Sequence, residues 1–386
     1  MKIDDDIRAL HDEMTEWRRD LHAHPETAFE EHRTSAFVAD KLKSFGIEVH
    51  QGLAGTGVVG VLRGRGDGRH IGLRADMDAL DITERTNLPY RSRNPGKMHA
   101  CGHDGHTTML LGAARYLAAK RDFSGTVYFV FQPAEENEGG GRRMVEEGLF
   151  DRFPMEAVYG LHNWPGMPVG TVAAQAGPMM AAYDIFEITL TGRGGHAAMP
   201  HQGTDAIVAG SHLVQALQTI ASRNVDPLDA VVVSVTQIHG GDTWNVVPEE
   251  VILRGTARSF EAAVQDLTET AIRRIAAGVA ATYGVSVDVR YERRYPPTIN
   301  SEKQSEIAAA AAAAVVGESR VARSVKPCMG AEDFAFMLQQ RPGSYIWLGA
   351  GEDSANLHSP HYDFNDEILP IGVSYWASLV RHELGG

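Results

Sequence analysis

The chain has 386 residues, 43% of them hydrophobic, which is enough to bury a full core and predicts about two domains rather than one. Its formal net charge of -14 repels phosphate, so the composition argues against binding to nucleic acids or to anionic membrane surfaces. Two cysteines, Cys101 and Cys328, are too few for a disulfide scaffold, and each is either a buried small residue or a metal-binding or catalytic thiol.

The N-terminal sequence MKIDDDIRALHDEMTEWRRDLHAHPE has acidic residues where a signal peptide would have its apolar core. No later segment approaches the roughly 20 apolar residues that a membrane span needs. We therefore expect a cytoplasmic protein, without nucleic-acid or membrane partners, that acts on a small molecule.

A glycine motif, Gly55-Thr-Gly-Val-Val-Gly60, matches the GxGxxG fingerprint of dinucleotide-binding proteins. Together with a Cys/His metal site, it would indicate a zinc-dependent dehydrogenase. That fingerprint must open a helix, whereas here a short strand pattern and a glycine turn follow from Val61. The context therefore disfavours the dehydrogenase.

From the N-terminus to about residue 180, apolar runs alternate with helical patterns, which predicts an α/β domain with helices on both faces of a sheet. Four apolar runs lead into polar side chains that can bind metals: Ile71–Arg74 before Asp76 and Asp78, Val127–Phe131 before Glu135 and Glu136, Ala157–Leu161 before His162, and Tyr345–Leu348 before His358. Ligands of open α/β sheets bind beyond the carboxyl ends of the strands, so we expect these side chains to gather at one edge.

The segment Met98-His-Ala-Cys-Gly-His-Asp-Gly-His-Thr places Cys101, His103 and His106 in a short loop before a helical pattern that runs from residue 107 to residue 119. A thiolate and an imidazole two residues apart can reach one cation, and this pair suits zinc or another first-row divalent ion. Taken alone, the segment is explained equally well by a helix N-terminus with capping or solvent-exposed histidines.

Glu135 and Glu136 follow a strongly apolar strand. Adjacent side chains in extended backbone point to opposite sides, so one carboxylate can bind a metal while the other acts on water as a general base. Paired acids on a surface loop are the common alternative, but the strand end and the glycine run 139–141 favour a site that a ligand approaches closely. Single histidines such as His162 and His358 are usually structural, but their position at the same sheet edge favours metal binding.

Residues 182–293 follow a different pattern, which predicts an inserted ferredoxin-like domain. The predicted elements have the order βαββαβ: strand 183–190, helix 205–222, strand 230–238, strand 249–259, helix 262–283 and strand 285–291. The segments 1–181 and 294–386 would then form one discontinuous catalytic domain. An exposed sheet edge or the helices of the inserted domain could support a dimer.

Taken together, the motifs resemble those of the M20 family of metallopeptidases, in the amidohydrolase branch with hippurate hydrolases, plant auxin-conjugate hydrolases and bacterial N-acetyl-diaminopimelate deacetylases. The similarity runs from Trp17-Arg-Arg-Asp-Leu-His-Ala-His-Pro-Glu to Tyr362-Asp-Phe-Asn-Asp, and several motifs agree in order and spacing. The resemblance implies an α/β fold: a zinc-peptidase-like catalytic domain with a central mixed sheet, and an inserted ferredoxin-like βαββαβ dimerisation, or lid, domain.

The resemblance also implies two divalent metal ions per subunit and a general base, Glu135. The implied metal ligands are Cys101, His103, Glu136, His162 and His358, with the thiolate of Cys101 shared by both ions. Other branches of the family take a ligand from a His-x-Asp motif, which here is Asp76-Met-Asp78. This departure suggests that His103 has taken over the ligand role and that Asp78 supports catalysis by orienting His103, and it leaves the role of Asp76 open.

In the inserted domain, His196 in Gly192-Arg-Gly-Gly-His-Ala-Ala-Met-Pro-His resembles the histidine that reaches the active site of the partner subunit. Asn245 and Arg258 match positions that the family uses to hold the substrate, although a surface charge on a strand would also explain Arg258. The resemblance therefore implies a homodimer in which His196 stabilises the oxyanion.

The expected activity is hydrolysis of the amide bond of an N-acyl amino acid, such as hippurate or an N-acetyl amino acid, with manganese, zinc, cobalt or nickel as the two metal ions. An N-acetyl-diaminopimelate deacetylase or a small-peptide hydrolase is the alternative. A non-catalytic, metal-dependent binding protein is a remoter one, because such a descendant would be expected to lose the base or a ligand first, and this chain retains them all.

Overall fold

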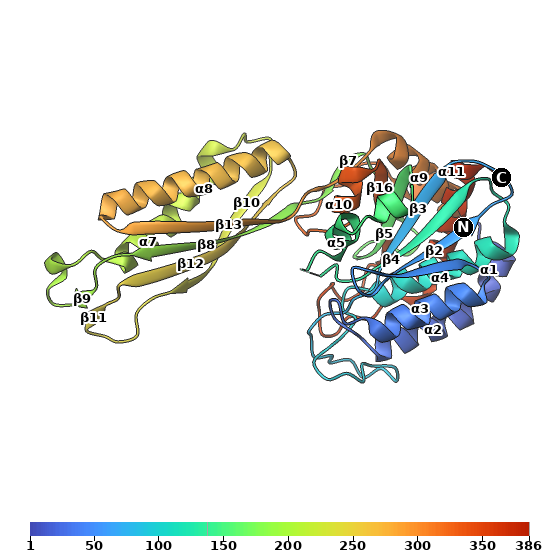
Figure 1. Cartoon of the computed structure of the whole chain (residues 1–386), viewed down its shortest axis with the longest axis horizontal. Helices are drawn as coiled ribbons and strands as arrows, with labels where there is room; N and C mark the ends of the chain where they lie inside the picture. The colour runs from blue at the N-terminus through green and yellow to red at the C-terminus, as the bar shows by residue number, and fades with distance from the viewer. Residues whose placement is uncertain (137, 386) are drawn as a thin grey trace. The chain divides into compact units, whose positions relative to one another are not determined.

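The computed structural model describes residues 1–136 and 138–385, and the chain forms two compact units (Figure 1). Unit 1 comprises Met1–Met179, Ile299–Lys326 and Asp333–Gly386, and unit 2 comprises Met180–Thr298 and Pro327–Glu332. Along the sequence, unit 2 is thus inserted into unit 1.

Unit 1 contains a sheet and the helices that surround it. Its helices are α1 (Asp5–Ala9), α2 (His11–Ala23), α3 (His32–Ser44), α4 (His103–Lys120), α5 (Gly140–Glu146), α6 (Leu149–Arg152), α9 (Glu302–Val316), α10 (Ala335–Gln340) and α11 (Leu369–Leu384). Its sheet contains β1 (Glu48–Leu53), β2 (Gly57–Arg63), β3 (His70–Asp76), β4 (Thr126–Gln132), β5 (Ala157–Pro165), β6 (Val172–Ala173), β15 (Val321–Ala322) and β16 (Gly343–Gly351). The short strands at the sequence boundaries of the units are β7 (Gly177–Met180) and β14 (Thr298–Asn300).

The sheet of unit 1 is mixed and has the strand order β1-β2-β4-β3-β5-β16-β6-β15. In its centre, β4, β3, β5 and β16 are neighbours that run parallel to one another. These strands are buried along nearly their whole length, as expected for parallel strands covered on both faces. The carboxyl ends of four strands therefore meet at one edge of the sheet.

Helices cover both faces of this sheet, as the sequence pattern predicts. A side chain added at Gly60 of β2 would touch Leu42 of α3, whereas one added at Gly57 would touch Met144 of α5. The two positions are an odd number of residues apart and therefore face opposite sides of the strand. On the side of α3, α4 packs against α2, α3 and α11, and α11 packs against α9.

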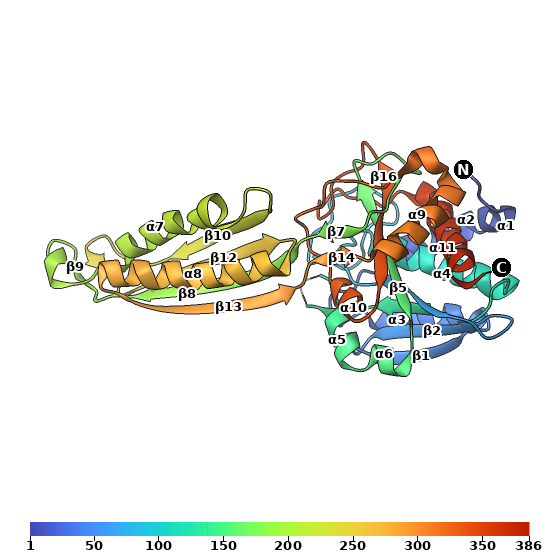
Figure 2. The same ribbon diagram turned by 90° about the horizontal axis from the view of Figure 1, so that it is seen from above.

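Unit 2 contains a second, antiparallel sheet. Its elements are β8 (Ala182–Thr191), β9 (Gly195–His196), α7 (Ala206–Leu217), β10 (Val231–His239), β11 (Val246–Val247), β12 (Glu250–Ser259), α8 (Ala262–Tyr283) and β13 (Ser286–Tyr295). The four long strands have the order β10-β12-β8-β13, and α7 and α8 cover one face (Figure 2). Burial alternates along β8 because only this face packs against helices. The predicted α/β fold class is confirmed, whereas the boundaries 182 and 293 of an independently folding domain stay a prediction.

Several elements differ from the sequence prediction. Helix α4 begins at His103 rather than at Thr107, because Gly102 adopts a positive φ of 98° and ends the preceding loop. Strand β5 continues to Pro165, so His162 lies within the strand rather than after it. The pairing of β9 with β11 is not predicted, since strands of two residues give no periodic signal. The glycine motif opens β2 and no helix, as predicted.

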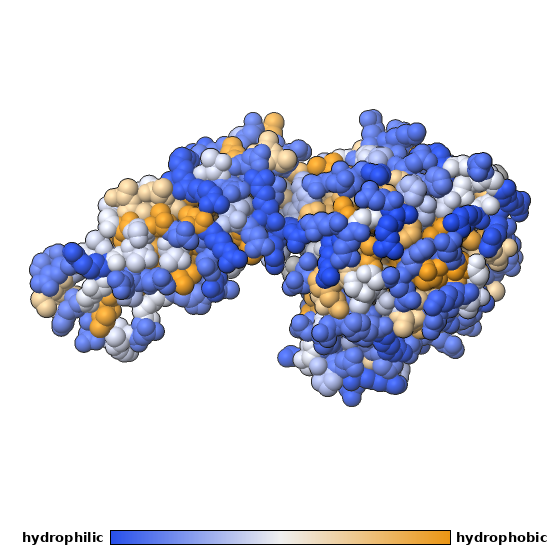
Figure 3. Space-filling model, viewed as in Figure 1, coloured by the Kyte–Doolittle hydropathy of each residue, from blue (hydrophilic) through white to orange (hydrophobic). Residues whose placement is uncertain are grey.

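Within residues 1–136 and 138–385, no helix has the length and apolar character that a membrane crossing requires. Figure 3 shows hydrophilic residues over most of the displayed face, with apolar residues in separate patches. The exposed apolar side chains of unit 2 include Ile207 and Val208 on α7, and Val232 and Ile238 on β10.

Candidate metal centre

Polar side chains of unit 1 stand at the carboxyl edge of the four central parallel strands. Strand β3 ends at Asp76, which pairs in the sheet with Gln132, the last residue of β4. On the other side of β3, Arg74 pairs with Gly160, which places His162 level with Asp76. The register of the strands thus brings distant parts of the sequence to one place.

Two groups of potential ligand atoms share the thiol of Cys101. All ligand atoms lie within 4.8 Å of one another in the group Cys101, His103 and His162, and equally in the group Cys101, Glu136 and His358. A thiolate combined with imidazoles and a carboxylate is a ligand set that suits zinc and other first-row divalent cations. One sulfur shared by two groups could serve as a ligand common to two ions.

His103 directs one ring nitrogen into this cluster. Its Nδ1 lies 2.9 Å from the backbone oxygen of Asp78 and 3.1 Å from Oδ1 of the same residue. Its Nε2 is buried and has no hydrogen-bond partner among the described residues. Because an unpaired nitrogen in the interior costs free energy, the orphaned Nε2 fits a site built for a cation.

His162 is oriented by the backbone next to it. Its Nδ1 donates to the backbone oxygen of Asn163 at 2.7 Å, and its Nε2 lies 3.4 Å from Sγ of Cys101. Burial, together with the nearby His106, holds the pKa of His162 well below its usual value. The ring therefore stays neutral, which is the form that binds metals.

The loop after β4 does not continue as extended chain. Ala134 adopts a positive φ of 53°, and its N–H donates to the buried Glu31 at 2.9 Å. The carboxylates of Glu135 and Glu136 do not diverge as predicted. A carboxylate oxygen of each lies within 4.8 Å of the other and of a ring nitrogen of His103.

The two glutamates nevertheless have different partners. Glu135 is 6% exposed and accepts a hydrogen bond from the N–H of Asp333 at 3.2 Å. The backbone N–H of Glu136 donates to Asp78 at 2.9 Å, and its carboxylate lies 3.0 Å from Nε2 of His358. Asp78 therefore contacts both His103 and the backbone of Glu136.

His358 comes from a loop beyond β16 with an unusual backbone. It adopts a positive φ of 63°, and its N–H donates to the backbone oxygen of Ala100 at 2.7 Å. This hydrogen bond ties the loop to the segment that carries Cys101. The side chain of His358 is about half exposed, so this part of the cluster is open to solvent.

The cluster is rich in negative charge. Burial raises the pKa of the Cys101 thiol well above its usual value, and the nearby glutamates raise it further. Burial opposes a charge on His103, but the carboxylates of Asp76 and Asp78 raise its pKa to about 10. Both shifts describe a place that favours positive charge, and a divalent cation supplies such charge and deprotonates a coordinating thiol.

His106 belongs to the same motif as Cys101 but faces other partners. Its Nδ1 lies 2.6 Å from Oδ1 of Asp76, and its Nε2 lies 2.7 Å from Oδ1 of Asn163. The motifs in the sequence do not reveal three further buried residues, Arg74, Gln132 and Asp333, of which Asp333 contacts Glu135. Arg74 carries the only available signal, a charged residue inside an apolar strand pattern, since such residues are rarely buried without partners.

In unit 2, His196 and Asn245 lie close together. His196 of β9 pairs with Val246 of β11, and the N–H of Ala197 donates to the backbone oxygen of Asn245 at 3.0 Å. Both predicted residues are exposed.

Arg258 lies in β12 of the four-stranded sheet, whereas β9 and β11 form a separate two-stranded sheet. It pairs with Tyr183 near the end of β12, and its guanidinium group stacks on the Tyr183 ring at 4.0 Å. Glu250, at the start of β12, pairs with Thr191, shortly before His196. The length of β12 between Glu250 and Arg258 corresponds to about 26 Å of strand. One copy of unit 2 therefore does not bring Arg258 together with His196.

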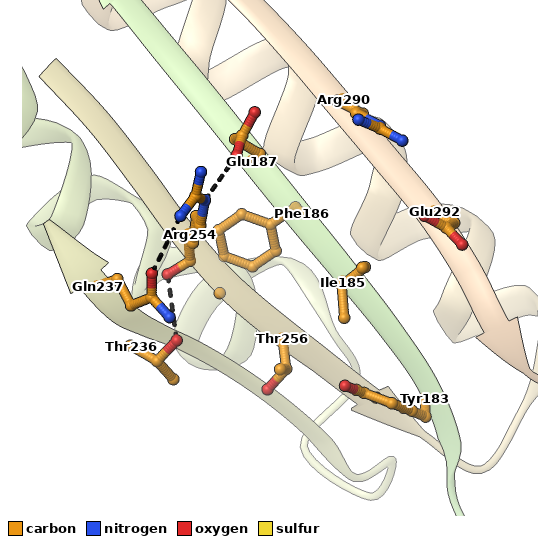
Figure 4. A pocket seen from close by; sticks show the side chains of 11 residues that line it. Tyr183, Ile185, Phe186, Glu187, Thr236, Gln237, Arg254, Thr256, Arg290 and Glu292 are labelled. Atoms are coloured by element: carbon orange, nitrogen blue, oxygen red, sulfur yellow. Dashed lines mark hydrogen bonds and ion pairs between the residues drawn. The ribbon is translucent and has the colours of Figure 1, made fainter. Parts of the chain in front are cut away.

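A hollow of about 410 Å³ lies on the face of the unit 2 sheet that carries no helices (Figure 4). Arg254 extends across it and bonds to Glu187 at 2.6 Å and to Gln237 at 3.4 Å. None of the predicted site residues lines this hollow.

Comparison with known proteins connects this fold and cluster to one family. The family model described as peptidase family M20/M25/M40 matches residues 72–382. Hippurate hydrolase from Campylobacter jejuni is 40% identical over 379 residues, which covers 98% of this chain and 98% of that protein. N-acetylcysteine deacetylase from Bacillus subtilis is 38% identical over 374 residues, which covers 96% and 97%, respectively. A crystal structure from B. subtilis, described as a dinuclear metal binding peptidase from the M20 family, has a TM-score of 0.85 and 35% identity, and covers 97% of this chain and 98% of that chain.

The fold and the ligand cluster, with these relatives, define a metal-dependent amidohydrolase, and the predicted enzyme class is confirmed. The chain belongs to peptidase family M20/M25/M40.

Proposed function

We propose that the chain hydrolyses the amide bond of N-acyl amino acids and releases a carboxylic acid and a free amino acid, with two divalent cations bound in unit 1. The observation that carries this proposal is the pair of ligand groups that share Cys101, with Glu135 beside them. Two of the similar proteins are hippurate hydrolase and N-acetylcysteine deacetylase, and each of these names states an N-acyl amino acid as the substrate.

Each ligand group would hold one ion. Cys101, His103 and His162 would hold the first, and Cys101, Glu136 and His358 the second. When bound, divalent cations supply Lewis-acid charge that acidifies water and polarises a carbonyl group. Manganese, zinc, cobalt and nickel all suit a Cys/His/Glu set.

Glu135 would take the proton of the attacking water and pass it to the leaving amine. Its carboxylate is nearly buried and held by the N–H of Asp333, so it is oriented before the substrate arrives. Asp78 would fix the ring of His103 by its contacts with Nδ1. His196 would donate to the carbonyl oxygen of the substrate as negative charge develops there.

The substrate carboxylate would bind to Arg258, and Asn245 would also hold the substrate. Both residues belong to unit 2. No carboxylate in the described part of the chain forms an ion pair with the half-buried Arg258. An N-acyl amino acid keeps its carboxylate and has no α-ammonium group, so it complements both this guanidinium group and a cationic centre.

A homodimer would complete the site. His196 and Asn245 lie beyond the end of the four-stranded sheet where β12 begins, and Arg258 lies near the end of β12, so different copies of unit 2 would supply them to one substrate. Strand β10 forms an edge of this sheet and exposes Val232 and Ile238, and an exposed apolar edge strand is suited to pairing with a second copy.

A substrate panel tests the proposed activity. The metal-free protein would be loaded separately with each of the four metals and assayed with hippurate, N-acetylcysteine, an indole-acetyl amino acid, N-acetyl-diaminopimelate and dipeptides. We expect hydrolysis of at least one N-acyl amino acid, and its loss on chelation. Cleavage of dipeptides alone would favour the small-peptide hydrolase, and selective cleavage of N-acetyl-diaminopimelate would favour the deacetylase. Metal binding without hydrolysis of any compound would favour the non-catalytic binding protein.

A further inference from the structure

Behind Glu135, a guanidinium group lies in the interior of unit 1. Arg74 of β3 is 1% exposed. Its side-chain nitrogens donate to Asp76 Oδ2 at 2.8 Å, to Asp333 Oδ1 at 2.9 Å and to Gln132 Oε1 at 2.8 Å. A buried charge is costly unless such partners surround it. The planar fork of arginine reaches all three groups at once, which a lysine ammonium group cannot do in the same geometry.

Asp333 contacts both ends of the loop that carries Glu135. Its carboxylate accepts from the side chain of Gln132, the last residue of β4, at 2.7 and 2.9 Å. It also accepts from the N–H of Gly141, near the start of α5, at 2.7 Å. The backbone N–H of Asp333 in turn donates to Oε1 of Glu135 at 3.2 Å. One residue thus holds the loop on both sides and the glutamate within it.

The fit around Gly141 leaves little room for the loop to shift. A Cβ atom added there would lie 3.0 Å from the backbone oxygen of Asp333 and 3.0 Å from Oε1 of Gln132. Close packing of this kind transmits a displaced side chain to its neighbours. A change in the Asp333 carboxylate should therefore move the glutamate loop.

The same guanidinium group fixes Asp76, whose role the sequence leaves open. One oxygen of Asp76 accepts from Arg74, and the other lies 2.6 Å from Nδ1 of His106. The ligand atoms of Asp76, His103 and His106 lie within 4.8 Å of one another. However, Asp76 and His106 are already engaged with each other and with Arg74 and Asn163. These contacts favour a supporting role for both residues rather than metal ligation.

We propose that Arg74 and Asp333 are positioning residues for Glu135: Arg74 fixes the Asp333 carboxylate, and Asp333 fixes the loop and the carboxylate of the general base. The inference rests on the proposed role of Glu135. It separates the placement of the base from the binding of metal, since neither Arg74 nor Asp333 belongs to the two ligand groups that share Cys101.

Two variants test this inference. Arg74→Lys keeps the charge and loses the fork, and Asp333→Asn keeps the shape and loses the charge. In each, kcat should fall about 10- to 100-fold, because a small misplacement of a reacting group has effects of this size. KM and the metal content, measured by mass spectrometry, should stay at the wild-type values. The control is Arg63→Lys, which changes an exposed arginine of β2 that pairs with Glu48 and should have no effect. A fall in kcat that follows a loss of metal would overturn the proposal.

The same variants combined with Glu135→Gln give a sharper result. Asp333→Asn should cause no further loss of kcat in the Glu135→Gln background, because its effect passes through Glu135. A role in stability alone would instead lower the residual rate by the same factor in both backgrounds. Such additive losses would contradict the positioning role.

Hydrogen exchange gives a measurement that does not depend on catalysis. Peptides that contain Gly141 should exchange faster in both variants than in the wild type and in Arg63→Lys. Unchanged exchange in both variants would overturn the proposed role of Arg74 and Asp333 in holding the loop, even in an active amidohydrolase. If exchange is faster in the variants but the wild type hydrolyses no N-acyl amino acid, the holding role of Arg74 and Asp333 is retained and the proposed function is rejected.

Discussion

At the scale of single residues, Glu135 and Glu136 are neighbours in the sequence with different surroundings. Glu135 is held by the N–H of Asp333, whereas the carboxylate of Glu136 lies against His358. Glu135→Gln should therefore keep the metals and lower kcat by about 10² to 10⁴, the usual loss when a general base is removed. Glu136→Gln should instead lose metal. Steady-state kinetics and metal analysis by mass spectrometry measure the two effects.

The exposed Glu146 of α5 provides a matched control, because Glu146→Gln makes the same chemical change outside the cluster. It should retain both metal and activity. Equal metal content and equal activity in the Glu135 and Glu136 variants would contradict the separate roles.

The two cysteines allow a second comparison of single residues. Cys101 belongs to both ligand groups, whereas Sγ of Cys328 in unit 2 accepts a hydrogen bond from the N–H of Gly330 at 3.2 Å. Cys101→Ala should lower the metal content and abolish hydrolysis, because both ions lose a ligand. Cys328→Ala should keep both properties. A Cys101→Ala protein with two ions per chain and full turnover would exclude the bridging role.

The spacing of chemical groups in the sequence is enough to predict Cys101, His103 and the glutamate pair as residues of a metal site, because short motifs preserve the order of potential ligands. It cannot predict the positive φ of Ala134 or the approach of both glutamate carboxylates to His103. Nor can it predict the contact of Asp333 with Glu135, since the two residues are far apart in the sequence and meet only in the folded chain.

At the scale of elements, a buried polar network joins α2 to the start of α4. Arg18 of α2 contacts Asp366 at 2.6 Å, Asp363 at 3.0 Å and Asp104 at 3.8 Å. His22, one turn further along α2, lies 2.8 Å from Asp104. Asp104 directly follows His103 in α4, so this network fixes the helix end that presents a potential ligand. It accounts for the polar motifs near Trp17 and Tyr362, whose function the sequence alone does not reveal.

This network should make stability depend on pH. Burial opposes a charge on His22, but the hydrogen bond that its Nδ1 donates to Asp104 and the carboxylate of Glu84, 3.5 Å from its Nε2, raise its pKa from 6.5 to about 9. A group whose pKa is higher in the folded state stabilises that state fully below its unfolded pKa, and the contribution is lost as the pH rises through the folded pKa. The wild type should therefore have a higher Tm than His22→Gln, and this difference should be largest at about pH 6. There the charge of His22 should raise the free energy of unfolding by an amount on the order of 3 kcal/mol, and this contribution should shrink toward pH 9.5.

Differential scanning calorimetry across this pH range checks the expectation. The control is His50→Gln, which removes a partly exposed imidazole of β1 and should change the Tm little. A Tm difference for His22→Gln that stays constant between pH 6 and pH 9.5 would show that the charge of His22 does not contribute.

The order of elements could be predicted, because the period of the hydrophobic pattern changes between strands and helices. The predicted helix 262–283 coincides with α8. The start of α4 could not be predicted, since the glycine-rich motif gives no periodic signal and the positive φ of Gly102 sets the boundary. This difference has a consequence for the site, because His103 is placed by the first turn of a helix rather than by a free loop.

At the scale of the whole molecule, unit 2 supplies the argument for two copies of the chain. Its own sheet separates His196 and Asn245 from Arg258 by the length of β12. This separation follows from antiparallel register and does not depend on the position of unit 2 relative to unit 1. If all three residues act on one substrate, one chain cannot supply them through a single unit 2.

We therefore predict that catalysis requires a dimer in which His196 of one subunit completes the centre around Glu135 of the other. The His196→Ala and Glu135→Gln homodimers should each be nearly inactive. A mixed dimer of the two variants, prepared by co-expression with two different tags, should regain up to half of the wild-type activity, because one of its two sites combines an intact Glu135 with an intact His196 from the other chain. If His196 acted within its own subunit, both sites of the mixed dimer would carry a defect. A mixed dimer verified by mass spectrometry that shows no recovery would therefore rule out the shared site, and a fully active monomer would do the same.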